Sequence, residues 1–144
     1  MKYSNVENVN REYIRKLVRD IEEAIRIILE DTSKPFNMLT RSEISEVRYY
    51  LIVLVEALVA LCYHIARRVC NVEVETPTKT FRLLVERGLL TEEEYSDFVK
   101  LVRLRNLLVH RYWTIDDRLI YENVKRNFRH VLSFVERVKH VFQL

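Results

Sequence analysis

The chain has 144 residues, 49% of them hydrophobic, which fits one domain with an ordinary core that needs no disulfide or metal ion for stability. Its single glycine and two prolines leave too few turn residues for many short strands, so the composition excludes a strand-rich fold and predicts an all-α protein. The net charge is only +3, but residues 101–144 hold 9 Lys and Arg against 4 Asp and Glu, which is typical of a polyanion-binding region or of solvated helix faces.

The N-terminal sequence and the two cysteines predict a cytoplasmic protein with reduced thiols. The first residues, MKYS, lead into polar residues, whereas a signal peptide continues into an apolar run. Cys62 and Cys70 lie eight residues apart in one predicted helix, which separates them too far for a disulfide. Because no Cys and His spacing is typical of a metal site either, we expect neither a metal ion nor a cofactor.

The first half of the chain predicts two long helices. Asn8 or Asn10 is a suitable cap for a helix whose apolar residues recur at helical spacing up to about Asp31. A second helix is expected to begin at Thr40 or Ser42 and to continue to about residue 69.

The second predicted helix is the most apolar segment, and Glu56 is the only charged residue between Tyr49 and Ile65. We do not expect it to span a membrane, because the run is short, carries an ionisable group at its middle and has no second candidate beside it. Such a helix is expected at the centre of a bundle or in an oligomer interface. Tyr49, Glu56 and Tyr63 share one side, where Glu56 could pair with an Arg of a cleft or form a structural ion pair.

Three more helices are predicted in the second half of the chain. A short helix over residues 78–87 is closed by Gly88. Thr91 caps the next helix, whose first turn carries three glutamates and which continues to about Val109. The last helix begins at residues 116–117, and its apolar stripe continues to the end of the chain.

Arg105 occupies an unexpected position in the fourth predicted helix. At about 100° per residue, it lies at the centre of an arc of apolar residues. The arc consists of Phe98, Leu101, Val102, Leu104, Leu108 and Val109. Burying an unpaired guanidinium is costly, so Arg105 must pair with an acid, lie at a wet interface or await an anion.

Three further polar side chains follow Arg105 in the sequence. Asn106 and His110 form an i, i+4 pair, and Tyr112 would lie on the side of Arg105 if the helix continued that far. Because His transfers a proton near neutral pH and Arg binds phosphate in bidentate fashion, this set suits phosphodiester chemistry. A salt-bridged Arg, a helix-end His and a packed Tyr would explain the same residues without any chemistry.

The stretch from Arg105 to Tyr112, RNLLVHRY, resembles the motif of HepT proteins in the HEPN superfamily, which is Arg, four residues, His, any residue and Tyr. The resemblance covers nearly the whole chain and includes the apolar second helix. Further matching positions are Pro77 before the short helix and Phe81 within it, Gly88-Leu89-Leu90 before the motif helix, and Ile115-Asp116-Asp117 with Tyr121 at the start of the last helix.

The resemblance implies one HEPN domain over residues 1–144, folded as an up-and-down bundle of four to five helices. It also implies a homodimer in which the two motif helices face each other across a basic cleft that admits RNA. Cleavage would be metal-independent, with the ribose 2′-hydroxyl attacking the adjacent phosphate. His110 would act as general acid or base, Arg105 would stabilise the crowded phosphate and Asn106 would orient the reacting groups.

The resemblance further implies a partner and a means of control. HepT proteins are toxins paired with an MNT-type nucleotidyltransferase antitoxin, which adds AMP groups to the motif tyrosine, here Tyr112. AMP groups beside Arg105 and His110 would block the cleft and neutralise its positive field. We expect neither DNA nor a membrane as a partner.

Two other functions agree with the same residues. In the first, the chain is a non-catalytic HEPN module that binds a nucleotidyltransferase partner or a nucleotide through the motif. In the second, it is a helical scaffold in which Arg105 and His110 tolerate substitution. Growth arrest on expression, abolished by His110→Ala, would separate a nuclease from both.

Overall fold

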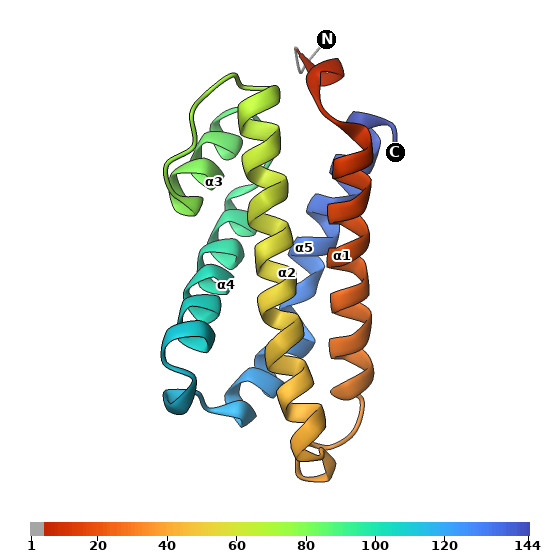
Figure 1. Ribbon diagram of the computed structural model, residues 1–144, viewed down its shortest axis with the longest axis vertical. Helices are drawn as coiled ribbons and strands as arrows, with labels where there is room; N and C mark the ends of the chain where they lie inside the picture. The colour runs from red at the N-terminus through yellow and green to blue at the C-terminus, as the bar shows by residue number, and fades with distance from the viewer. Residues whose placement is uncertain (1–4) are drawn as a thin grey trace.

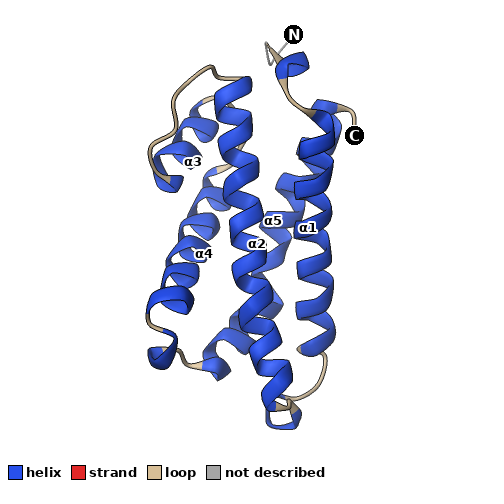
Figure 2. Cartoon of the chain, in the orientation of Figure 1, coloured by secondary structure: helices blue, strands red, loops and turns tan. Residues whose placement is uncertain are grey.

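The computed structural model describes residues 5–144, apart from the side chains of 125–127, and helices make up most of this part (Figures 1 and 2). The α-helices are α1 (Arg11–Asp31), α2 (Arg41–Arg68), α3 (Pro77–Glu86), α4 (Glu92–His110) and α5 (Asp117–Phe142). Three short 3-10 turns are η1 (Val6–Asn8), η2 (Phe36–Met38) and η3 (Tyr112–Thr114). The described residues contain no strand, so the predicted all-α class is confirmed.

The four long helices form an up-and-down bundle. In Figure 1, α1 descends, α2 ascends, α4 descends and α5 ascends behind them. α1 packs against α2 and α5, and α4 packs against the same two helices, so the four enclose one core. The short α3 lies against α2 and α4 at the upper end of the bundle. The predicted bundle architecture is therefore confirmed.

α2 is the apolar helix that was expected at the centre of a bundle or in an oligomer interface. Its first turn is closed by a capping box, in which Thr40 Oγ1 accepts from the Glu43 amide at 3.1 Å and Glu43 Oε1 accepts from the Thr40 amide at 2.9 Å. Within the described residues, α2 is the one helix long and apolar enough to cross a membrane, with a mean hydropathy of 1.9 over an 18-residue window. Of that window, 61% is buried inside the bundle, as expected for a core helix.

The turn between α3 and α4 needs the single glycine of the chain. Gly88 has φ 74°, a left-handed conformation that costs a residue without a Cβ very little. It allows the amide of Leu89 to donate to the carbonyl of Leu84 at 2.9 Å, which satisfies a free carbonyl at the end of α3. The predicted role of Gly88 is thus confirmed.

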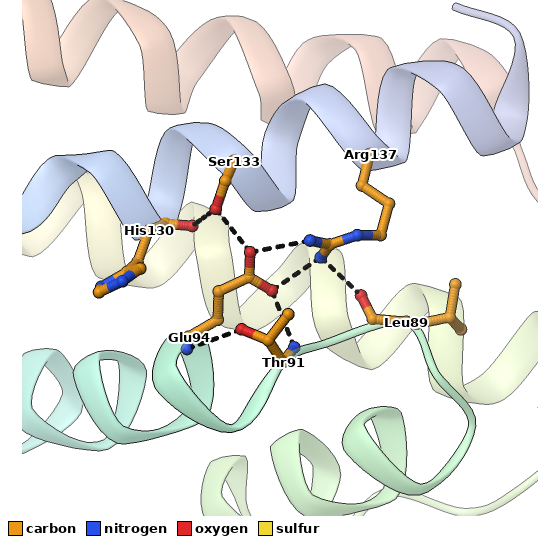
Figure 3. Close-up of polar contacts among 6 residues, drawn as sticks. All are labelled: Leu89, Thr91, Glu94, His130, Ser133 and Arg137. Carbon is orange, nitrogen blue, oxygen red and sulfur yellow. Dashed lines mark hydrogen bonds and ion pairs between the residues drawn. The ribbon is translucent and has the colours of Figure 1, made fainter.

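A buried polar network fixes the N-terminal end of α4 (Figure 3). Glu94 has only 1% of its surface exposed, and its carboxylate accepts from both terminal nitrogens of Arg137 on α5 at 2.7 and 3.0 Å. The hydroxyl of Ser133 donates to it at 2.5 Å and the amide of Thr91 at 2.9 Å. Burial by itself raises the pKa of Glu94, but these hydrogen bonds outweigh it, so the pKa lies below its usual value.

Candidate active site at the C-terminal end of α4

The arginine in the apolar arc of α4 is paired with an acid of α2. Arg105 donates from Nη1 to Oε1 of Glu56, and from Nε to Oδ1 of Asn106 at 2.9 Å. The side chain of Arg105 is 19% exposed, whereas that of Glu56 is 57% exposed. Of the three settings that the sequence allowed for Arg105, the structure has the ion pair, and it lies at the edge of the core, open to solvent on the side of Glu56.

The neighbouring motif residues lie on the outer face of the same helix. Asn106 and His110 are exposed and line an open depression of about 440 Å³. Its other lining residues are Arg103, Leu107 and Arg111. Because Asn106 also accepts the hydrogen bond from Arg105, this amide connects the guanidinium to the depression that contains the imidazole.

Tyr112 does not lie on the motif helix. α4 ends at His110, Arg111 leaves the helical region with φ −140° and ψ 44°, and Tyr112 begins the turn η3. The helix does not continue as far as Tyr112, so the condition for placing Tyr112 on the side of Arg105 is not met, whereas the expected helix end at about Val109 agrees with the structure. Its ring is 61% exposed and contacts Trp113 edge-on, with 5.3 Å between the ring centroids.

Arg48 of α2 binds the chain directly after the end of α4. It donates from Nη1 to the carbonyl of Tyr112 at 2.9 Å, and from Nε and Nη2 to the carboxylate of Asp117 at 2.7 and 3.0 Å. These bonds hold η3 and the first residue of α5 against α2. Asp116 caps α5 by accepting from the amides of Arg118 and Leu119, which completes the reversal of the chain.

Two residues of α2 extend the polar surface beside Arg105. Burial raises the pKa of the Tyr63 phenol, and the charges of Arg105 and Arg67 oppose that rise. The guanidinium of Arg67 lies over the Tyr63 ring, 5.6 Å from its centroid. The spacing of Tyr49, Glu56 and Tyr63 by sevens was the sequence signal for this face of α2; nothing in the sequence pointed to Arg48.

Both cysteines and His64 are buried outside the candidate site. Cys62 and Cys70 are buried free thiols, as predicted, and burial raises the pKa of each. His64 is buried, and its Nε2 accepts from the amide of Asn10 at 3.0 Å. Burial and two nearby arginines lower the pKa of His64, so the ring is held neutral. No three His, Cys, Asp or Glu side chains of the described part are grouped to hold a metal ion.

The sequence pattern of a family described as "Ribonuclease HepT-like" matches residues 14–138, which is most of the chain and includes the entire motif helix. The chain belongs to this HepT-like family. A curated protein of Archaeoglobus fulgidus, described as "Putative RNase", is 30% identical over 122 residues, which are 84% of this chain and 92% of that protein. The resemblance read from the motif is confirmed.

Solved structures show the same fold for this HepT-like chain. YutE from Bacillus subtilis, a cytosolic protein of unknown function, superposes with a TM-score of 0.81 at 17% identity, covering 94% of this chain and 92% of that one. The tri-AMPylated HEPN toxin of Shewanella oneidensis, in complex with MNT antitoxin, superposes with a TM-score of 0.79 at 23% identity, covering 89% and 97%. The fold is that of HEPN toxins.

Proposed function

We propose that this HepT-like protein is an endoribonuclease that cleaves RNA without a metal ion, through Arg105, Asn106 and His110. The observation that carries the proposal is the role of Asn106, which contacts Arg105 and lines one depression with His110. A cation, an amide and an imidazole are thereby gathered at an accessible end of α4. This is the set of groups that a phosphodiester transfer needs when RNA supplies its own nucleophile.

The reaction proceeds by attack of a ribose 2′-hydroxyl on the adjacent phosphorus. His110 accepts the hydroxyl proton as the new P–O bond forms, and the bond to the 5′-oxygen breaks. That oxygen leaves with a proton, which the protonated imidazole or water supplies, so the products are a 2′,3′-cyclic phosphate and a 5′-hydroxyl. Arg105 exchanges Glu56 for a phosphate oxygen and stabilises the charge that develops there, while Asn106 orients the guanidinium.

The protein acts as the toxin of a toxin–antitoxin pair, as a homodimer whose two α4 helices border one RNA cleft. This part of the proposal rests on the family motif and on the fold shared with HEPN toxins. An MNT-type nucleotidyltransferase silences it by transferring AMP from ATP to the phenol oxygen of Tyr112, releasing pyrophosphate. The 61% exposure of Tyr112 supports this step, because the phenol is open to a second enzyme.

RNA cleavage in the presence of a chelator tests the catalytic assignment. Labelled total RNA is incubated with wild type, His110→Ala and His140→Ala, the last being an exposed histidine in the final turn of α5 and hence a matched control. Wild type and His140→Ala are expected to cut equally, and His110→Ala at least about 100-fold more slowly. Activity that requires an added divalent metal would refute the metal-independent reaction.

Treatment with ATP and a cognate nucleotidyltransferase tests the control step. Wild type is expected to gain AMP and lose cleavage, whereas Tyr112→Phe should remain unmodified and active. If untreated wild type leaves RNA intact and still acquires AMP on Tyr112, the protein is a non-catalytic module that binds its nucleotidyltransferase, and the nuclease proposal fails.

A further inference from the structure

The only tryptophan of the chain lies at the end of the candidate site and is open to solvent. Trp113 is 70% exposed, more than any other large hydrophobic side chain that the structure describes. Tryptophan is usually largely buried, because covering its large apolar surface is favourable. An exposed tryptophan beside polar motif residues therefore indicates a surface that something covers.

Hydrogen bonds from within the turn and from α2 hold the turn that carries Trp113 in place. Within η3 the amide of Thr114 donates to the carbonyl of Arg111 at 2.9 Å, and the Tyr112 carbonyl accepts from Arg48 at 2.9 Å. The Tyr112 ring meets the Trp113 ring at an interplanar angle of 81°, which supports one edge of the indole. In Figure 1 this turn is at the foot of α4, where the chain crosses to α5. A ligand would thus meet an aromatic face that is already ordered, which lowers the entropic cost of binding.

The stretch of sequence that leads to Trp113 is predominantly cationic. Between Asp97 and Asp116 the sequence contains no acidic residue. The cationic side chains in this interval are Lys100, Arg103, Arg105 and Arg111, with His110 among them. Arg103, His110 and Arg111 also line the open depression on the outer face of α4. Trp, Tyr and Arg occur at protein–protein interfaces as well, so the excess of cationic over acidic residues selects the occupant: basic grooves with interleaved aromatic rings are typical of sites for single-stranded nucleic acid.

We propose that Trp113 is a stacking platform for an unpaired base of single-stranded RNA whose phosphates bind Arg103 and Arg111. The identity of the ligand rests on the proposed function; the platform itself rests on the exposure of Trp113, the hydrogen bonds that hold its turn and the cationic residues described above. Stacking on an aromatic face is tolerant of base identity, because every base has a π-face. Trp113 is therefore a substrate-positioning residue that selects single-stranded over duplex RNA.

Because Trp113 is the only tryptophan, its fluorescence reports on the platform directly. The probe is an eight-nucleotide 2′-O-methyl RNA, which lacks the nucleophile and remains intact, added to the full protein as a single strand or annealed to its complement. The single strand is expected to quench the emission at saturation, and the duplex is not. Because these variants lack the reporter, their binding is followed by the anisotropy of a fluorescently labelled strand: Trp113→Ala should bind it roughly tenfold more weakly and Trp113→Phe nearly as well as wild type. Leu132→Ala, which removes an exposed apolar side chain of α5, serves as the matched control and should bind normally.

Cleavage kinetics separate this inference from the proposed function. With a cleavable strand, Trp113→Ala should raise KM about tenfold and leave kcat within about twofold, since the residue contacts a base and not the reacting phosphate. Quenching and the affinity loss without any cleavage by wild type would sustain the platform and refute the nuclease. The platform would be overturned if Trp113→Ala cleaves RNA with an unchanged KM and the emission of the wild-type protein is not quenched when RNA binds. Unchanged RNA affinity with weakened self-association of Trp113→Ala would also overturn it and assign the surface to a second copy of the chain.

Discussion

Each end of α4 is joined to a neighbouring helix by an ion pair between a glutamate and an arginine, and the two glutamates differ in their exposure to solvent. At the N-terminal end, the Glu94 side chain is 2% exposed and its carboxylate receives hydrogen bonds from Arg137, Ser133 and the α4 cap. At the C-terminal end, Arg105 meets a Glu56 side chain that is 57% exposed. The arginines of the two pairs are both partly exposed, at 28% and 19%, so the difference lies in the carboxylates: that of Glu94 is enclosed by the protein, and that of Glu56 is accessible from solvent.

This difference predicts that the N-terminal end of α4 serves stability, whereas the C-terminal end serves the proposed function. A buried carboxylate that loses its partners is strongly destabilising, so the Glu94 network holds α4 and α5 in one register. An ion pair open to water contributes little to folding, and its partners exchange readily for other ions. In the proposed function, a phosphate replaces Glu56 on Arg105, and this exchange is expected to leave the bundle intact.

The largest expected effect is on catalysis at the open end. Arg105→Gln should slow RNA cleavage at least about 100-fold, because the charge that stabilises the phosphate is lost. Its melting temperature should stay close to that of wild type, since the lost ion pair is exposed on the Glu56 side. Arg19→Gln, which changes an exposed arginine of α1 outside the candidate site, is the control and should retain kcat. A variant that loses activity only because it unfolds would contradict the division between the two ends.

The second effect is on stability at the enclosed end. Glu94→Gln removes the charge that Arg137 contacts, and the free energy of unfolding should fall by about 3 kcal/mol. Urea denaturation followed by circular dichroism measures it. Glu93→Gln changes an exposed glutamate of the same first turn and should cost less than about 1 kcal/mol. Equal losses in both variants would show that only the helix dipole, and not the network, stabilises this end.

Helix boundaries were predictable because their signals are local. The cap at Thr91, the left-handed Gly88 and the start of α5 after Asp116 all involve residues within a few positions of one another. Of the alternatives for the second helix, Thr40 is the cap instead of Ser42, because Glu43 closes the box with Thr40. The candidate pairing of Glu56 with an arginine was also visible, since an isolated charge in an apolar helix requires a partner.

The contact that follows the motif helix was not predictable from local sequence, although the end of the helix, expected at about Val109, was predicted to within one residue of its position at His110. Just beyond that end, Arg48 binds the Tyr112 carbonyl and the Asp117 carboxylate. Arg48 is 69 residues from Asp117, so the interaction appears only after the bundle has formed. The exposure of Trp113 has the same origin, because it depends on where the turn lies and not on the residues beside it.

The third effect is the pH dependence of the enclosed end. The pKa of Glu94 is lowered in the folded protein from its ordinary value of 4.5, so its stabilisation is fully present above about pH 4.5. It is lost as the pH falls through the lowered folded pKa, because the carboxylate must then be protonated. Chemical denaturation between pH 3 and pH 7 should show a wild-type loss at acid pH that is smaller in Glu94→Gln. Parallel curves would show that other groups cause the acid sensitivity.

The smallest effect on folding is expected from Glu56→Gln, the counterpart of Glu94→Gln at the open end. With the Glu56 side chain 57% exposed, the free energy of unfolding should change by less than about 1 kcal/mol. RNA affinity should nevertheless rise a fewfold at low salt, because the phosphate no longer competes with a carboxylate for Arg105, and the gain should shrink as salt screens the charges. Denaturation and RNA titration of the same preparation measure both. If Glu56→Gln unfolds easily, Glu56 is a structural partner like Glu94. If the variant binds RNA less well, Glu56 instead positions Arg105 for the substrate.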